Sequence, residues 1–278
     1  MRVKKLLLTV ALLFAVPSVP AQTDDGAALA PVFQREVDRR LDIPREARER
    51  YAQLLEAALS GAETPFMDSQ YLLVLDRNPH VQAIFLYWLD LRAYPAEFHF
   101  IGAAPVSTGK PGAYDYFTTP TGVFAHTLAN KDYRAEGTRS KLGICGFGRK
   151  GMRVYDFGWV QGERGWGRGG MGRMRLLMHA TDPDYLEPHL GEAMSKGCIR
   201  IPATLNDFID RYGILDADYE QALANGERLW MMRPDRTPTP WSGRYLVIVD
   251  SGSTERPVWS PVPAARQAEK NMDSGSVR

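Results

Sequence analysis

Cys198 and His179 are the residues of this chain whose types and spacing most readily support covalent chemistry. Cys198 lies in SKGCIRI, residues 195–201, and His179 lies near the end of the apolar run MRLLMHA. A thiol attacks as the thiolate, so a neighbouring group must lower its pKa or remove its proton, and a histidine does both. The loop between the two runs can bring both side chains together at neighbouring strand ends. One interpretation is therefore a cysteine nucleophile with a histidine base.

Two other interpretations of Cys198 stay open on the residues alone. It can be a small buried apolar residue, or it can form a disulfide with Cys145, the second cysteine of the chain. An oxidising compartment would allow the bridge, although a chain of this length does not need one to fold. We expect no zinc site, because no further Cys or His lies at ligand spacing from His179 and Cys198. The histidines expected to be solvated or structural are His80, His99 and His126.

The residues beside Cys198 suit the handling of a carbonyl substrate. Gly197 has no Cβ, so the backbone there can approach a bound carbonyl, and the N–H groups of Gly197 and Cys198 are candidates for an oxyanion hole. Ser195 adds a hydroxyl. Arg200 follows Cys198 by two residues on the same strand face, where it can bind a substrate carboxylate. The alternative for Arg200 is a structural ion pair within the protein. Lys196 can lower the thiol pKa, hold an anionic group or be solvated.

These stretches resemble the signature of the YkuD-type L,D-transpeptidases. In that family a histidine is followed, after a similar gap, by Ser or Thr, His, Gly, Cys, an apolar residue, and Arg or Asn. Here fifteen residues separate His179 from Ser195. Upstream, STGK at 107–110 and TPTGVF at 119–124 resemble the family's S-T-G-K and T-P-x-G segments, and the similarity covers roughly residues 69–215. The departures are Lys196, where the family usually has histidine, and Ala180, where it usually has glycine.

The resemblance implies a peptidoglycan L,D-transpeptidase that needs no metal or cofactor. Cys198 would attack a stem-peptide carbonyl next to an L-centre, with His179 as general base and acid and Gly197 in the oxyanion hole. An amine of a second stem would resolve the thioester, and carbapenems would acylate the same thiol. The substrate-binding residues would be Ser195, Lys196 and Arg200.

Three alternatives to transfer remain. An L,D-carboxypeptidase or amidase would hydrolyse the same stems, because only the acceptor differs. A non-catalytic cell-wall-binding protein would have its two cysteines joined as a Cys145–Cys198 disulfide. A general cysteine protease would cleave ordinary all-L peptides. The role of Cys145 stays open among these.

The N-terminus has the composition of a secretory signal peptide over residues 1–21. Three basic residues precede an apolar stretch over 6–16, and small residues follow at 19 and 21. Residue 22 is Gln, so no lipid anchor is expected, and we expect an exported protein without a transmembrane segment after cleavage. The full chain has 34 basic and 33 acidic residues; without the three basic residues of the signal the balance is 31 to 33, a net charge of −2. This balance argues against nucleic acid as a partner.

The elements that must position the site follow from periodicity. Residues 22–65 are expected to form a helical segment with two short helices, one over PVFQREVDRRL and one from Pro44 to about Gly61. Residues 66–250 are expected to form one mainly β domain, a sandwich or open barrel with flanking helices, whose strands include MRVYDFGW, MRLLMHA, GCIRIP and RLWMMRP. One helix is expected over TLNDFIDRYG, capped by Thr204 and ended by Gly213, and another near residues 216–225. Residues 251–278 are expected to be disordered.

The glycine-rich segment at residues 158–172 leaves two interpretations. It can be a flap over a cleft, with Trp159 and Trp166 touching substrate, or a plain surface hairpin. Its GWGRGG run is not a nucleotide-binding signature, since the spacing and a strand-to-helix setting are missing.

Overall fold

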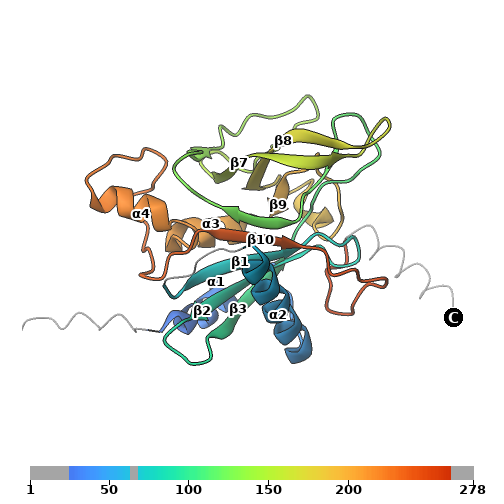
Figure 1. Cartoon of the computed structure of the whole chain (residues 1–278). Helices are drawn as coiled ribbons and strands as arrows, with labels where there is room; N and C mark the ends of the chain where they lie inside the picture. The colour runs from blue at the N-terminus through green and yellow to red at the C-terminus, as the bar shows by residue number, and fades with distance from the viewer. Residues whose placement is uncertain (1–24, 63–67, 264–278) are drawn as a thin grey trace, which may run out of the picture.

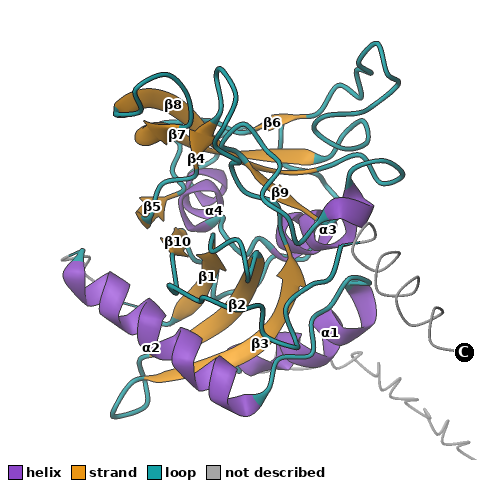
Figure 2. Ribbon diagram, turned by 90° about the vertical axis from the view of Figure 1, so that its right-hand side faces the viewer, coloured by secondary structure: helices purple, strands orange, loops and turns teal. Residues whose placement is uncertain are grey.

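The computed structural model describes residues 25–62 and 68–263, and these form two β-sheets with helices around them (Figures 1 and 2). The expectation of a mainly β fold with flanking helices is confirmed. The expected signal peptide at 1–21 and the last part of the expected tail, 264–278, lie outside the described residues. No helix in the described part of the chain is long and apolar enough to cross a membrane.

Sheet A is built from strongly apolar runs such as QYLLVLD and AIFLYWLD. Its strands follow the order β3-β2-β1-β10-β5, in which only β1 and β10 are parallel neighbours. The bounds are β1 Gln70–Asp76, β2 Ala83–Asp90, β3 Glu97–Pro105, β5 Gly122–Ala125 and β10 Tyr245–Val249. Nearly every residue of β1 and β2 is buried, because both faces of the sheet are covered. Continuous apolar runs such as QYLLVLD are the expected pattern for strands covered on both faces.

Sheet B carries the stretches with the candidate site residues. Its order is β4-β7-β8-β9, and β6 pairs with β7. The bounds are β4 Phe117–Thr118, β6 Tyr133–Arg134, β7 Arg153–Arg164, β8 Met171–Ala180 and β9 Ile199–Ile201. β8 and β9 are parallel, so the chain must cross over between them, and it does so through the loop that contains the short helix η2, Glu187–His189.

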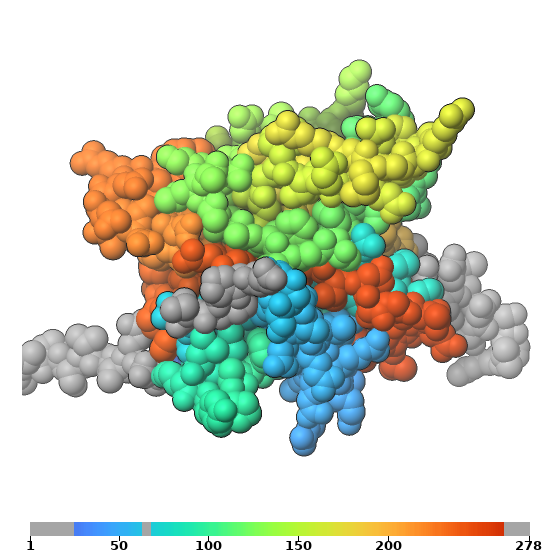
Figure 3. Space-filling view, viewed as in Figure 1, coloured from blue at the N-terminus to red at the C-terminus, as the bar shows by residue number. Residues whose placement is uncertain are grey.

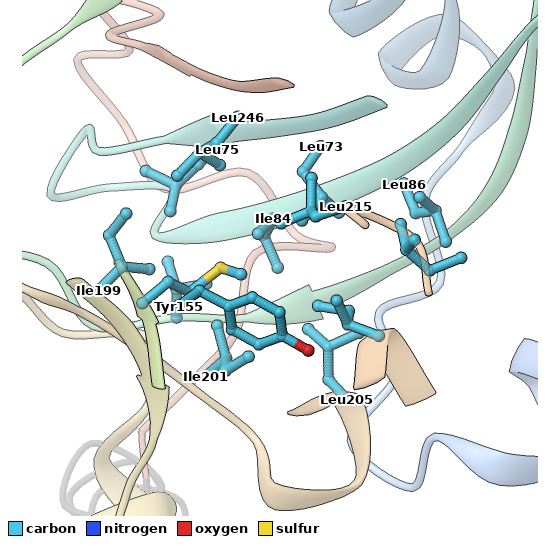
Figure 4. Packing of buried hydrophobic residues seen from close by; sticks show 14 of the residues in the cluster. Leu73, Leu75, Ile84, Leu86, Tyr155, Ile199, Ile201, Leu205, Leu215 and Leu246 are labelled. Carbon is cyan, nitrogen blue, oxygen red and sulfur yellow. The ribbon is translucent and has the colours of Figure 1, made fainter. Parts of the chain in front are cut away.

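The main core fills the space between the two sheets (Figure 4). Leu73, Leu75 and Ile84 of sheet A face Tyr155, Ile199 and Ile201 of sheet B there. A second cluster lies on the other face of sheet A, under helix α2 (Arg45–Gly61). The outer face of sheet B has only a small apolar cluster, so this face is available for polar side chains.

The helices lie at the sides of the sheets. Their bounds are α1 Leu29–Glu36, α2 Arg45–Gly61, α3 Ala203–Tyr212 and α4 Ala217–Ala224, with a 3-10 turn, η1, at Gly26–Ala28. The expected helices at 44–61 and near 216–225 are present, and Gly213 ends α3 with a left-handed φ of 61°. The expected cap is wrong: α3 begins after Pro202, and the Thr204 hydroxyl pairs with Asp38 instead.

Two other expectations differ from the structure. RLWMMRP at 228–234 is a loop, because the carbonyl of Met231 accepts from the Arg134 side chain (Nε–O 2.7 Å) rather than from a strand. Residues 251–263 pack on the domain although their composition suggested disorder. The Ser260 hydroxyl contacts the carbonyl oxygens of His80 and Val81 at 2.8 Å, and these bonds hold the segment in place.

Candidate active site

The candidate residues share the outer face of sheet B because of strand register. Tyr133 of β6 aligns with Val154 of β7, Val154 aligns with His179 of β8, and His179 aligns with Arg200 of β9. Aligned residues on neighbouring strands project to the same face, as do residues two apart along one strand. Cys198, two residues before Arg200, packs against the apolar cluster of this face together with Tyr133. The register therefore places His179 and Cys198 on the same face of neighbouring strands.

His179 is held as a neutral base. Its Nδ1 lies 2.6 Å from the carbonyl oxygen of Ala180, and a carbonyl only accepts, so Nδ1 carries the proton and Nε2 is left as an acceptor. Burial lowers the pKa of His179 to about 4; the bond to Ala180 acts against this change and the charge of Arg200 adds to it. The ring of Phe147 lies edge-on to the imidazole, with 4.6 Å between the ring centroids. The imidazole is thus fixed in tautomer and orientation.

The thiol of Cys198 is partly buried and protonated at rest. Burial raises its pKa, while a backbone hydrogen bond from Leu177 and the charge of Arg200 lower it by less. The carbonyl oxygen of Arg175 lies 4.0 Å from Sγ and accepts from the thiol. A resting thiolate–imidazolium pair is not favoured by this environment, because both charged forms are disfavoured. The thiol proton must leave as the sulfur attacks, which is general-base catalysis.

Arg200 supplies a positive charge with no carboxylate beside it. Its guanidinium forms no ion pair with any residue that the structure describes, so the structural ion pair considered from the sequence is not found there. Burial lowers the pKa of Arg200, although the group stays cationic at neutral pH. An uncompensated, half-buried guanidinium binds a carboxylate or phosphate well.

A groove of about 560 Å³ opens beside Arg200. Its other walls come from the loop 136–148 and from Leu186. The same loop carries Phe147, whose ring lies against His179. The groove has the size of a site for a small molecule or a short peptide, and its lining includes Arg200 and Phe147, the ring that contacts His179.

The two motifs of the sequence support each other through backbone contacts. Segment 107–110 runs beside segment 195–200: the amide of Ser195 donates to the Thr108 carbonyl (2.9 Å), and that of Lys110 donates to the Ser195 carbonyl (3.0 Å). The hydroxyl of Thr119 accepts from the amide of Gly109 and donates to the carbonyl of Gly197, both at 2.8 Å. A Cβ at Gly109 would lie 2.0 Å from the carbonyl oxygen of Phe117, so this position needs glycine.

Three of the predicted roles beside Cys198 do not match the geometry. The amide of Gly197 donates to the Ser195 hydroxyl at 3.0 Å, so this N–H does not point at a developing oxyanion. Ser195 is 1% exposed, and its hydroxyl donates to the Cys198 carbonyl at 2.5 Å, so it shapes the turn and does not face substrate. The exposed ammonium of Lys196 lies 3.2 Å from Asp115, which matches the solvated alternative. Gly197 has a φ of +131°, a conformation that glycine permits.

Sequence reasoning missed two residues around the site, Tyr133 and Phe147. Tyr133 and Phe147 come from a short strand and a loop far upstream of Cys198, and nothing in their local sequence marks them. Thr119 belongs to the upstream motif, but its contact with Gly197 depends on tertiary packing.

Cys145 and Cys198 are both free thiols. The Cys145 sulfur lies 3.8 Å from the Gly137 carbonyl, and its amide donates to Asp182 at 2.8 Å, whereas Cys198 contacts Arg175. The disulfide alternative is therefore not the state of this structure. The described residues contain no group of three or more His, Cys, Asp or Glu side chains that could hold a metal.

The glycine-rich segment 158–172 forms the end of the β7–β8 hairpin. Trp166 packs edge-on against Phe117 with ring centroids 4.8 Å apart, and Trp159 is 54% exposed, with the guanidinium groups of Arg173 and Arg175 over its ring. This geometry matches the second interpretation of the segment, a plain surface hairpin.

A buried charge network supports β7 from the other side of the site. Arg153 is fully buried and forms ion pairs with the carboxylates of Asp132, Asp210 and Asp216. Asp132 also accepts from His126, at 2.8 Å, which confirms His126 as a structural residue. The carboxylates raise the pKa of Arg153 despite its burial, which lowers it.

Comparisons with known proteins leave the family open. No family model matches the chain, and no curated protein matches it. Among solved structures, it is similar to a fused Zn-dependent amidase/peptidase/peptidoglycan-binding domain-containing protein from Clostridium acetobutylicum. The identity is 14%, the match covers 75% of this chain and 64% of that chain, and the TM-score is 0.28. A superposition this loose assigns neither family nor activity, so function must be argued from the residues of the site.

Proposed function

We propose that this protein is a cysteine-dependent L,D-transpeptidase that acts on the stem peptides of peptidoglycan. The observation that carries the proposal is the placement of Cys198, the neutral base His179 and the unpaired Arg200 on one face of two parallel strands, beside a groove. The resemblance of the two motifs to the YkuD-type family supplies the substrate class. The N-terminal composition supports export, where such a substrate would lie.

The first step forms a thioester. Nε2 of His179 takes the thiol proton as Sγ of Cys198 attacks the peptide carbonyl, and a C–S bond forms. The C–N bond of the stem peptide then breaks, and the leaving amine receives the proton from the imidazolium. A pKa near 4 makes His179 a strong acid once protonated, which favours return of the proton to the amine. The product of this step is an acyl-enzyme and a free amino acid.

The second step transfers the acyl group. His179 removes a proton from the amine of a second stem, the amine attacks the thioester, and the thiol of Cys198 is released. Arg200 binds a carboxylate of the donor stem during both steps. Water in place of the amine gives a carboxypeptidase, and this alternative uses the same residues. No observation favours a non-catalytic wall-binding protein, because both thiols are free.

Intact-mass spectrometry with a carbapenem tests the proposal, since this inhibitor is a strained acyl donor that carries a carboxylate. We expect one adduct per chain on the wild type and on Cys145→Ala, and none on Cys198→Ala. Purified stem peptides then separate the two reactions: cross-linked dimers indicate transfer, and trimmed monomers indicate hydrolysis. An adduct on Cys198→Ala, or no adduct on a fully reduced wild type, would refute the proposal.

A further inference from the structure

A second cavity is lined in part by the residues that directly follow the loop of the groove. It has a volume of about 520 Å³, and its lining includes residues 149–152, Trp230 and residues 232–234. Figure 3 shows the orange surface of the region after α3 beside the green surface of the loop before β7. Ligand sites commonly have this volume. The proposed transfer reaction uses none of the residues that line it.

Trp230 is held outward at this cavity. Its side chain is 71% exposed, whereas its neighbours Leu229 and Met231 are 7% and 1% exposed. Leu229 and Met231 anchor the segment in a small apolar cluster with Tyr219, and the Arg134 side chain binds the Met231 carbonyl. Because the residues on both sides are buried, the backbone at Trp230 loses little conformational entropy when a ligand binds. The indole is therefore a preorganised flat surface on which a ring or an apolar face can stack.

The charge at the cavity is positive. Arg134, Arg149, Lys150 and Arg233 line it together with one acid, Asp207. Arg134 and Arg233 are already paired, with Asp210 and Asp235. Arg149 and Lys150 are exposed and form no ion pair with the part of the chain that the structure describes. Two free cations beside an indole select a ligand that combines a ring with negative charge.

We propose that this cavity binds an acidic glycan, with a sugar ring on Trp230 and an anionic group at Arg149 and Lys150. The substrate class rests on the proposed function, because a wall enzyme meets sugar strands that carry acidic peptides. Residues 136–148 line the groove and residues 149–152 line the cavity, so one continuous segment contributes to both sites, and a strand held in the cavity would present its peptides to the groove. The site would therefore fix the enzyme on the polymer while the groove selects the peptide.

Co-sedimentation with purified, protein-free peptidoglycan sacculi tests this site. All binding measurements use a Cys198→Ala background, so that no turnover occurs. We expect Trp230→Ala to weaken the apparent affinity about tenfold, which is about 1.4 kcal/mol. The double variant Arg149→Ala/Lys150→Ala should show a similar loss in low salt and a smaller one in high salt. Chitin, a neutral polymer of N-acetylglucosamine, should bind less than sacculi.

Control variants distinguish binding at this site from non-specific adsorption to sacculi. Trp159→Ala removes another exposed indole beside two arginines and should bind sacculi like its parent. In the background with Cys198 intact, Trp230→Ala should react with a carbapenem at the wild-type rate. Unchanged binding by both cavity variants, equal loss in Trp159→Ala, or equal binding to chitin would overturn the proposal. If Cys198 forms no carbapenem adduct but the Trp230-dependent binding persists, the transpeptidase proposal fails and this site stands.

Discussion

Ser195→Ala distinguishes a residue that shapes the catalytic turn from one that binds substrate. The hydroxyl of Ser195 accepts from the amide of Gly197 at 3.0 Å and donates to the carbonyl of Cys198 at 2.5 Å. Removing it deletes both bonds, and the amide of Gly197 is left buried without a partner. A hydrogen bond contributes about 0.5–1.5 kcal/mol net, and an unsatisfied buried donor costs about 1–3 kcal/mol.

The expected loss for Ser195→Ala is therefore about 2–4 kcal/mol in the free energy of unfolding. For a chain of this size, this corresponds to a fall in Tm of roughly 4–15 °C. Carbapenem acylation of Cys198 should also slow, because the turn that presents the thiol has lost its internal bonds. Urea unfolding followed by circular dichroism gives the free energy, and mass spectrometry gives the rate.

Ser140→Ala is the matched control for this experiment. The Ser140 hydroxyl also accepts from two backbone amides, those of Leu142 and Ile144, but in an exposed loop where water can replace it. We expect a change below about 1 kcal/mol there. If Ser195→Ala unfolds like the wild type while its reaction with stem peptides shows only a raised KM, Ser195 binds substrate and our account of the turn is wrong.

Three further predictions concern the base, the cation and the buried network. Burial lowers the pKa of His179 to about 4 from 6.5. Protonation of His179 should therefore leave the acylation rate unchanged between pH 7 and pH 5 and should lower it near pH 4. A loss of rate centred near pH 6.5 would contradict the burial argument. The same lowered pKa contributes stability above pH 6.5 that is lost towards pH 4, since the unfolded chain binds the proton first; His179→Gln should lack this part of the pH dependence in urea unfolding. Arg200→Gln should slow carbapenem acylation about 10–100-fold, because it removes a charge-assisted hydrogen bond to the inhibitor carboxylate. The free energy of unfolding should stay within about 1 kcal/mol of the wild-type value. An unaltered acylation rate would show that Arg200 does not bind the inhibitor. Arg153→Met should cost about 3–5 kcal/mol, because it removes the buried cation shared by three carboxylates and leaves each with only its second partner, His126, Arg134 or Arg236. Arg45→Met removes an exposed pair with Glu49 and should leave the free energy of unfolding almost unchanged. Equal effects of the two substitutions would mean that the buried network is not needed for stability.

Several features of this protein could be predicted from local sequence. Apolar runs such as QYLLVLD specify strands, because an uninterrupted run of this length and composition is stable only when covered on both faces. The apolar spacing in residues 44–61 and the glycine at 213 specify helices and a helix end, because periodicity and backbone freedom are properties of the chain itself. Local pattern failed at 228–234, where a side chain rather than a strand satisfies the backbone.

The identities of Cys198 and His179 as candidate nucleophile and base came from sequence, because chemistry depends on residue type. What surrounds them depended on tertiary structure. The parallel register of β8 and β9 places Arg200 beside His179, and Arg200 has no ion-pair partner among the described residues. Packing turns the Ser195 hydroxyl inward, where it accepts the hydrogen bond of the Gly197 amide. The ammonium of Lys196 pairs with Asp115. Side-chain partners are chosen by distances between segments far apart in the chain, and local sequence carries no record of those distances.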